Sequence, residues 1–177
     1  MSNGTPIPVD LDKIFCIMAK NYRLKKLYLK AVAITESALN PRAYRYEPAF
    51  WERYLKDNPE WKDRDPHEVS ASYGLMQLMF TTAHALGFDG SGEDLYNPVY
   101  NIELGAKLLR QLLDKVEADH LDISSQRHPC AIASARYNGG SRGNPGPDGT
   151  LRNQEYVDKV FRTWKRLTEE EKECDET

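Results

Sequence analysis

The sequence predicts a mainly α-helical fold with at most one short β-hairpin. Apolar residues recur at the three- and four-residue spacing of helices along most of the chain, whereas the alternation typical of strands is weak. Hydrophobic residues make up 40% of the 177 positions and charged residues 29%, which is ordinary for a soluble globular protein with a real core. We therefore expect residues 1–177 to form a single domain.

The first expected helix is amphipathic and starts near position 11. Its apolar face is formed by Leu11, Ile14, Phe15 and Met18. Asp10 suits the N-cap, because a carboxylate there can accept hydrogen bonds from the free N–H groups of the first turn.

The second expected helix is buried on most sides and leads to Glu36. Residues 27–34 carry one charge in eight positions, and a surface helix would show a polar stripe. We expect Asn40-Pro41 to stop it, because the residue before a proline is pushed out of the α region. Burial would raise the pKa of Glu36 toward neutrality and make it a potential general acid. The alternative is a helix-end glutamate in a structural hydrogen bond.

The rest of the chain continues the helical pattern. Asn97-Pro98 combines an N-cap with a proline at the first helical position and predicts the start of a long helix. A short hairpin is expected only within 58–73, and residues 169–177 form an acidic tail that we expect to fray. The other expected helices span 47–57, 75–86 and 130–137, and a last one contains Val157, Val160, Phe161 and Trp164.

Charge and cysteine content exclude several kinds of function. The net charge of −3 gives no general attraction to nucleic acid. The three cysteines, Cys16, Cys130 and Cys174, are too widely spaced for a disulfide framework or a metal site, and the four histidines form no ligand pair. We therefore expect no metal and no cofactor. No stretch has the length of a transmembrane helix.

Three segments combine polar residues with glycine or tyrosine in apolar surroundings. Residues 74–77 have the sequence GLMQ, residues 137–140 YNGG and residues 156–157 YV. Singly, each has a structural explanation, because glycines favour turns and tyrosines commonly pack in cores. Together with Glu36-Ser37, and in this order, they resemble the motifs of the lytic transglycosylase SLT domain in the goose-type lysozyme superfamily. The resemblance covers roughly residues 20–165 and implies a lysozyme-like, mainly α fold.

The resemblance also implies roles for the matched residues around the reaction centre. Glu36 corresponds to the catalytic acid of the family. Tyr156 corresponds to the tyrosine beside that acid, and would hydrogen-bond Glu36 and orient it. Tyr137 and Asn138 would position the glycan or its N-acetyl group.

Five other residues are expected to contact or position the substrate. Ser37 belongs to the same motif as Glu36, and Met76 and Gln77 would line the groove near it. Ser70 and Ser72 are further polar candidates close to the GLMQ segment.

The chain departs from the family pattern at two places. Arg152 and Asn153 stand where the family often has Glu-Thr, so the role of that glutamate is not carried over. The gap between Glu36 and the GLMQ segment is also longer than in compact members, and holds an aromatic, charged insert over 44–73.

The aromatic residues of the insert have two interpretations. Phe50 and Tyr54, four positions apart, could dock a small helix on the body of the domain, and this is the interpretation we favour. They could instead line the saccharide groove, since aromatic faces suit sugar rings. Trp51 and Trp61 remain open between the same alternatives.

The resemblance implies cleavage of the β-1,4 bond between N-acetylmuramic acid and N-acetylglucosamine in peptidoglycan. Glu36 would act as acid and then as base, and the product would carry a 1,6-anhydro ring. One alternative is a goose-type hydrolase, in which a second carboxylate comes from Asp57, Glu60, Asp63 or Asp65. Another is a non-catalytic wall-binding or virion structural component.

The expected partner is the peptidoglycan glycan strand. We expect a monomer, with no nucleic-acid partner and no stable membrane insertion. The N-terminus has neither the cationic start nor the apolar stretch of a signal peptide. We therefore expect synthesis in the cytoplasm and action on the wall after release, as for a bacteriophage lysin, a virion-borne enzyme or a cargo of a secretion machine.

Overall fold

Helices form most of the computed structural model, which describes residues 9–119, 127–146 and 149–175. Within these ranges the strands make up a single small sheet, so the predicted mainly α fold is confirmed. The α-helices are α1 (Leu11–Asn21), α2 (Lys26–Ser37), α3 (Pro48–Phe50), α4 (Pro66–Val69), α5 (Phe80–Ala85), α6 (Pro98–Ala118), α8 (Pro129–Gly139) and α9 (Gln154–Asp175).

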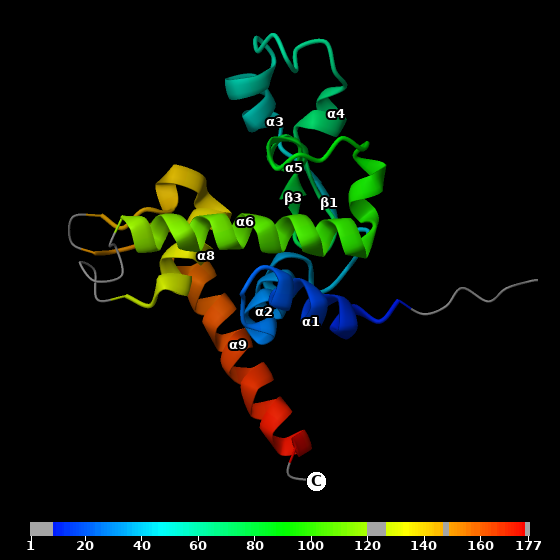
Figure 1. Ribbon diagram of the computed structural model, residues 1–177. Coiled ribbons are helices and arrows are strands. Elements are labelled where there is room, and N and C mark those ends of the chain that lie inside the picture. The colour runs from blue at the N-terminus through cyan, green and yellow to red at the C-terminus, as the bar shows by residue number, and fades with distance from the viewer. Residues whose placement is uncertain (1–8, 120–126, 147–148, 176–177) are drawn as a thin grey trace, which may run out of the picture.

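The long helix α6 divides the molecule into two parts. Figure 1 shows α1, α2 and α9 below it, and the sheet with α3, α4 and α5 above it. Helix α2 packs along α9, while α8 packs on α6. The lower part is therefore a helical body, and the upper part a smaller lobe built around the sheet.

Helices α1 and α2 begin near the expected positions, but α2 ends early. The Asp10 carboxylate accepts a hydrogen bond from the Lys13 backbone N–H at 3.0 Å, as the N-cap prediction requires. Helix α2 stops at Ser37, before Asn40-Pro41, because Ala38 and Leu39 adopt left-handed φ angles of 53° and 61°. The prediction that the proline ends this helix is wrong, since a proline restrains only the residue directly before it.

The first two strands of the sheet are the two ends of the insert, and the third strand follows the GLMQ segment. Strands β1 (Tyr44–Tyr46), β2 (Ala71–Tyr73) and β3 (Leu78–Met79) pair antiparallel in the order β1-β2-β3. The hairpin expected within 58–73 is therefore wrong. Strands of two or three residues are too short for alternation to be visible in the sequence.

The insert between β1 and β2 folds into short helices. Within the helix expected over 47–57, Pro48 is the first residue of α3, which continues into a π-helical turn, η1 (Trp51–Leu55). Trp61 is buried and packs edge-on against Phe80, with ring centroids 6.1 Å apart. Trp61 is thus a core residue, which answers one of the two questions that the sequence left open.

The helix expected over 75–86 is present only in the second half of that range. Residues 74–77 form a turn between β2 and β3, and α5 spans only Phe80–Ala85. Gly74 and Gln77 both have positive φ angles, of 70° and 46°, which no helix accommodates. Gly87, with a φ of 93°, lies just beyond α5.

The C-terminal half agrees more closely with the expectations. The Asn97 side chain accepts from the Val99 N–H at 2.9 Å and caps α6 directly before Pro98. Two 3-10 turns, η2 (Glu93–Tyr96) and η3 (Gly140–Gly143), precede α6 and follow α8. Helix α9 continues to Asp175, so the backbone is helical past Glu169, where we expected a frayed tail.

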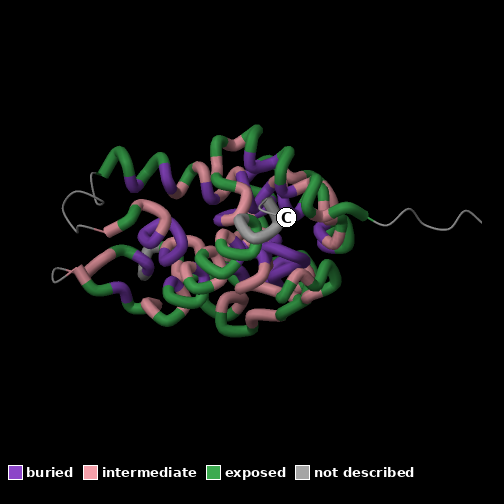
Figure 2. The backbone as a smooth tube through the Cα atoms, turned by 90° about the horizontal axis from the view of Figure 1, so that it is seen from below, coloured by how far each residue is buried: buried purple, intermediate pink, exposed green. Residues whose placement is uncertain are grey.

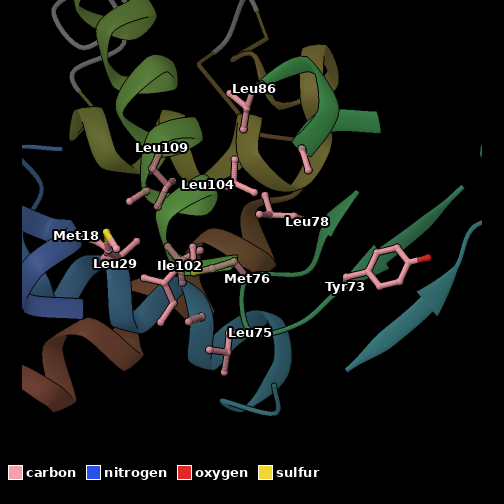
Figure 3. Close-up of a cluster of buried hydrophobic side chains, with 14 of the residues drawn as sticks. Met18, Leu29, Tyr73, Leu75, Met76, Leu78, Leu86, Ile102, Leu104 and Leu109 are labelled. Carbon is pink, nitrogen blue, oxygen red and sulfur yellow. The ribbon is translucent and has the colours of Figure 1, made fainter. Parts of the chain in front are cut away.

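The core joins the two parts of the molecule. Buried segments lie inside and exposed ones outside in the view of Figure 2. Figure 3 shows Leu29 of α2 near Ile102 of α6, with Leu75 and Met76 of the GLMQ turn reaching the same cluster. Across the described ranges, no helix is long and apolar enough to cross a membrane.

Candidate active site

Glu36 lies in the last turn of α2, next to a residue that ties this turn to the lobe. The Ser37 hydroxyl donates to the Leu75 carbonyl at 2.8 Å and also lies 3.3 Å from the Ala33 carbonyl. The carboxylate is therefore held at the junction of the helical body and the GLMQ turn. Ser37 acts here as a structural link.

The GLMQ turn is fixed by a buried asparagine of α6. Asn101 donates from Nδ2 to the Tyr73 and Leu95 carbonyls, both at 2.9 Å, and accepts from the Met76 N–H at 2.7 Å. A Cβ atom at Gly74 would lie 2.5 Å from Asn101 Nδ2, so only glycine fits there. Sequence reasoning missed the importance of Asn101, because one polar residue on a long helix looks like a surface position.

The side chains of Met76 and Gln77 pack against or hydrogen-bond other parts of the protein. The Met76 side chain is fully buried against Gly105, where a Cβ atom would lie 2.7 Å from Met76 Cγ. Gln77 is half-buried and donates from Nε2 to the Ala43 and Gly74 carbonyls, at 3.2 and 3.1 Å. The expectation that the Met76 side chain lines a groove is wrong in this conformation, because the core takes it up.

Two tyrosines from the C-terminal helices surround the carboxyl group. Tyr156, in the first turn of α9, donates from Oη to Glu36 Oε1 at 2.6 Å. Tyr137, near the end of α8, donates to the Met76 carbonyl at 2.7 Å. Burial raises the pKa of both phenols well above the usual range, and the nearby Glu36 adds to the shift. The predicted contact between Tyr156 and Glu36 is therefore present.

The pKa of Glu36 is raised from 4.5 to about 7. Loss of solvent is the largest cause, while the hydrogen bond from Tyr156 and the positive charge of Arg45 partly oppose it. Near neutral pH both protonation states of this carboxyl group are thus populated. Oε1 is bonded to Tyr156, and Oε2 has no hydrogen-bond partner in the described chain, which leaves Oε2 to exchange a proton.

Arg45 is a second residue that the sequence analysis missed. It lies at the centre of β1, is exposed, and forms an ion pair with Glu47 through Nε and Oε1 at 2.5 Å. Its charge reaches Glu36 and lowers the pKa of that carboxyl group. The available signal in the sequence was its position between Tyr44 and Tyr46, because alternate residues of a strand lie on opposite faces of the sheet.

Asn138 is exposed at the end of α8, where Asn153 orients it. Asn153 donates from Nδ2 to Asn138 Oδ1 at 3.1 Å and to the Ala135 carbonyl at 2.9 Å. Asn138 is exposed, and its NH₂ group makes no hydrogen bond to a described residue. Asn153, at a position where the family often has threonine, thus supports a neighbour of the site.

Ser70 and Ser72 are buried in the lobe and do not face solvent. The Ser70 hydroxyl donates to the Glu47 carbonyl at 2.7 Å, and the Ser72 hydroxyl lies 3.2 Å from the Met79 sulfur. The expectation that these two serines contact a substrate is wrong for this conformation. The Ser70 hydroxyl joins the two ends of the insert, and the Ser72 hydroxyl contacts the neighbouring strand β3.

The insert carboxylates do not act on Glu36. Asp65 caps α4 by accepting from the His67 N–H at 2.9 Å, and Glu60 lies 3.5 Å from His84. Among the described residues, none of Asp57, Glu60, Asp63 and Asp65 contributes to the pKa shift of Glu36. The site as described therefore centres on a single carboxyl group.

Comparison with known protein families gives one match. The model of the transglycosylase SLT domain family matches residues 14–146, which include Glu36, the GLMQ turn and Asn138. The match ends before α9, so Tyr156 lies outside it. Among curated proteins, nothing matches the chain.

Proposed function

Because the chain belongs to the transglycosylase SLT domain family, whose activity is of the peptidoglycan lytic transglycosylase type, we propose that it cleaves the β-1,4 bond between N-acetylmuramic acid and N-acetylglucosamine and leaves a 1,6-anhydro end. The observation that carries this proposal is the single carboxyl group at the site. Glu36 has a pKa of about 7 and is held by Tyr156, and no described carboxylate shifts it. One group that exchanges its proton near neutrality can serve both steps.

In the first step Glu36 Oε2 donates a proton to the glycosidic oxygen as the bond to C1 of the muramic acid breaks. The N-acetyl group of the same sugar stabilises the positive charge at C1. The Glu36 carboxylate then takes the proton of the C6 hydroxyl, whose oxygen bonds to C1. The proton gained by the leaving sugar is thereby replaced on Glu36, and no water is consumed.

The neighbouring residues support these steps through position and charge. Tyr156 fixes Oε1, so that Oε2 is the oxygen that faces the reacting bond. Tyr137 holds the GLMQ turn through the Met76 carbonyl. The free NH₂ group of Asn138 suits the carbonyl oxygen of an N-acetyl group.

Product analysis tests the reaction type. We expect mass spectrometry of digested peptidoglycan to show anhydromuropeptides. Reducing muramic acid ends would instead mean hydrolysis of the goose-lysozyme kind, with a water molecule in place of the C6 hydroxyl.

A zymogram with Glu36→Gln tests whether the chain is an enzyme at all. We expect this variant to lose clearing of peptidoglycan by roughly 100-fold or more, because it cannot donate a proton. Equal clearing by the variant and the wild type would contradict the role of Glu36. Wall binding without clearing by either protein would favour a non-catalytic component.

A further inference from the structure

A cleft beside the sheet lies outside the group of residues around Glu36. Its volume is about 690 Å³, which falls within the roughly 300–1,000 Å³ of typical ligand pockets. The insert supplies most of its walls, and β3 supplies one side. The lining includes Glu47, Phe50, Glu52, Arg53, Tyr54 and Met79.

The cleft lies beside the sheet, at one end of a cross-strand row of side chains that has Arg45 at its other end. Arg45, Ser72 and Met79 are directly paired across the three strands, so their side chains share one face. Met79, at one end of this row, lines the cleft, while the charge of Arg45, at the other end, acts on Glu36. Glu47, the ion-pair partner of Arg45, also lines the cleft.

The cleft offers an aromatic surface together with hydrogen-bonding groups. Tyr54 is 55% exposed, which is unusual for a large ring with a packing role, and its centroid lies 5.0 Å from that of Phe50. Phenol, carboxylate and guanidinium groups surround the two rings. An apolar surface bordered by such groups matches a sugar ring, which has apolar C–H faces and a rim of hydroxyl groups.

Both acidic groups of the lining are paired with basic side chains of the protein. Glu47 is paired with Arg45 at 2.5 Å, and Glu52 with Lys56 at 3.0 Å. The guanidinium of Arg53 lies over the Tyr54 ring at 5.9 Å. Because both carboxylates are paired, the lining keeps the charge of Arg53, and its polar groups can hydrogen-bond the hydroxyl groups of a sugar.

We infer that this cleft binds a sugar residue of the glycan strand at a distance from the bond that is cleaved. The inference rests on the proposed function for the identity of the strand. It assigns Tyr54 to ligand binding, while Phe50 packs on the core, in agreement with the favoured interpretation that this helix docks on the domain. The insert thereby extends the binding surface beyond the residues matched by the family motifs.

A binding experiment tests the cleft independently of catalysis. Chitohexaose and chitobiose, oligomers of N-acetylglucosamine, are titrated by calorimetry into Glu36→Gln protein with and without Tyr54→Ala. We expect Tyr54→Ala to weaken chitohexaose binding roughly five- to tenfold and to leave chitobiose binding nearly unchanged. Tyr54→Phe keeps the ring and should retain most of the affinity.

Tyr100→Ala provides a matched control. Tyr100 is 48% exposed and contacts Phe88, away from the cleft lining. This variant should bind chitohexaose like the parent. Unchanged chitohexaose affinity in Tyr54→Ala, or an equal loss in Tyr100→Ala, would overturn the inference.

A cleavage assay separates failure of the cleft from failure of the proposed function. In the Glu36-containing protein, Tyr54→Ala should reduce kcat/KM on long glycan strands and leave cleavage of a short tetrasaccharide unchanged. An equal loss on both substrates contradicts a remote subsite. A loss seen only with strands that carry peptide stems would mean that the cleft binds the stem. Absence of cleavage by the wild type would refute the proposed function, while the calorimetric result would still decide on the cleft.

Discussion

At the scale of single residues, the behaviour of Glu36 depends on two opposing influences. Loss of solvent raises its pKa to about 7, and the hydrogen bond from Tyr156 pulls the value back. The same tyrosine therefore orients the carboxyl group and adjusts its acidity. These two effects can be separated by experiment.

The Tyr156→Phe variant is expected to be slower and to titrate at higher pH. Removal of the hydrogen bond releases Glu36, which we expect to reduce kcat roughly 10- to 100-fold. Because this bond lowers the pKa of Glu36, its loss should move the alkaline limb of the pH–rate profile upward. A reduced kcat with an unmoved alkaline limb would contradict the assignment. Tyr100→Phe should change neither quantity.

Glu36 is also expected to make stability depend on pH. Its pKa is higher in the folded protein than in the unfolded chain, so the folded state binds more protons between about pH 4.5 and 7. The contribution of this group to the free energy of unfolding therefore falls as the pH rises through that window. Glu36→Gln removes the penalty, so the variant should exceed the wild type by about 2–3 kcal/mol at pH 8 and match it near pH 4.

Urea denaturation at a series of pH values measures this difference. Glu155→Gln is a suitable control, because Glu155 is exposed and its one ion pair among the described residues is with Lys159, four residues along α9. A constant gap between Glu36→Gln and the wild type across the whole pH range would argue against a raised pKa.

Sequence motifs identified the central residues but not which of their atoms matter. The contact between Glu36 and Tyr156 was expected from the resemblance to the family and is present in the structure. Met76 belongs to the same motifs, yet its backbone N–H and carbonyl groups form the hydrogen bonds while its side chain is buried. A motif shows that a position is constrained and does not distinguish backbone from side-chain contacts.

At the scale of elements, the turn between β2 and β3 depends on α6. Asn101 satisfies three buried backbone groups of Tyr73, Met76 and Leu95, and no other described element makes hydrogen bonds to all three. The turn therefore takes its shape from a helix that starts more than twenty positions later in the chain. The local sequence pattern carries no information about this distant partner, so it predicted a helix where the turn lies.

Asn101→Ala should destabilise the protein strongly. It leaves three buried backbone groups without partners, and we expect the free energy of unfolding to fall by about 3 kcal/mol or more. Asn97→Ala, which removes only the N-cap of the same helix, should cost about 1 kcal/mol. Chemical denaturation compares the two variants, and equal losses would contradict the special role of Asn101.

Helices were easier to predict than strands, for a physical reason. The apolar face of α6 recurs from Ile102 to Val116, whereas β3 contains two residues and its position is set by pairing with β2. Left-handed Ala38 and Leu39, which end α2, carry no sequence signal because neither residue favours positive φ. Long periodic segments are visible in a single sequence, and elements defined by distant partners are not.

At the scale of the whole molecule, α9 combines a packed part with an exposed part. Leu167 is buried, whereas the described side chains beyond Thr168 form exposed ion pairs with Lys26, Lys165 and Arg166. The fold should therefore depend on the helix up to Thr168 and little on its last turns.

Truncation after Thr168 is expected to lower the free energy of unfolding by about 1 kcal/mol or less, because exposed ion pairs contribute little. Leu167→Ala should cost about 2–4 kcal/mol through the cavity it leaves. Thermal melts of both variants test whether the packed part of α9 ends at Thr168. A larger loss from the truncation than from Leu167→Ala would show that the end of α9 has a packing role.

The hydrogen bond between Tyr156 and Glu36 joins positions 120 residues apart. Closing so long a loop is slow, and chains are synthesised from the N-terminus, so α2 emerges well before its partner α9. A nascent or proteolytically shortened chain that ends after α8 carries Glu36 without the phenol that orients it. The order of synthesis thus delays assembly of the proposed wall-cleaving centre until α9 has been made.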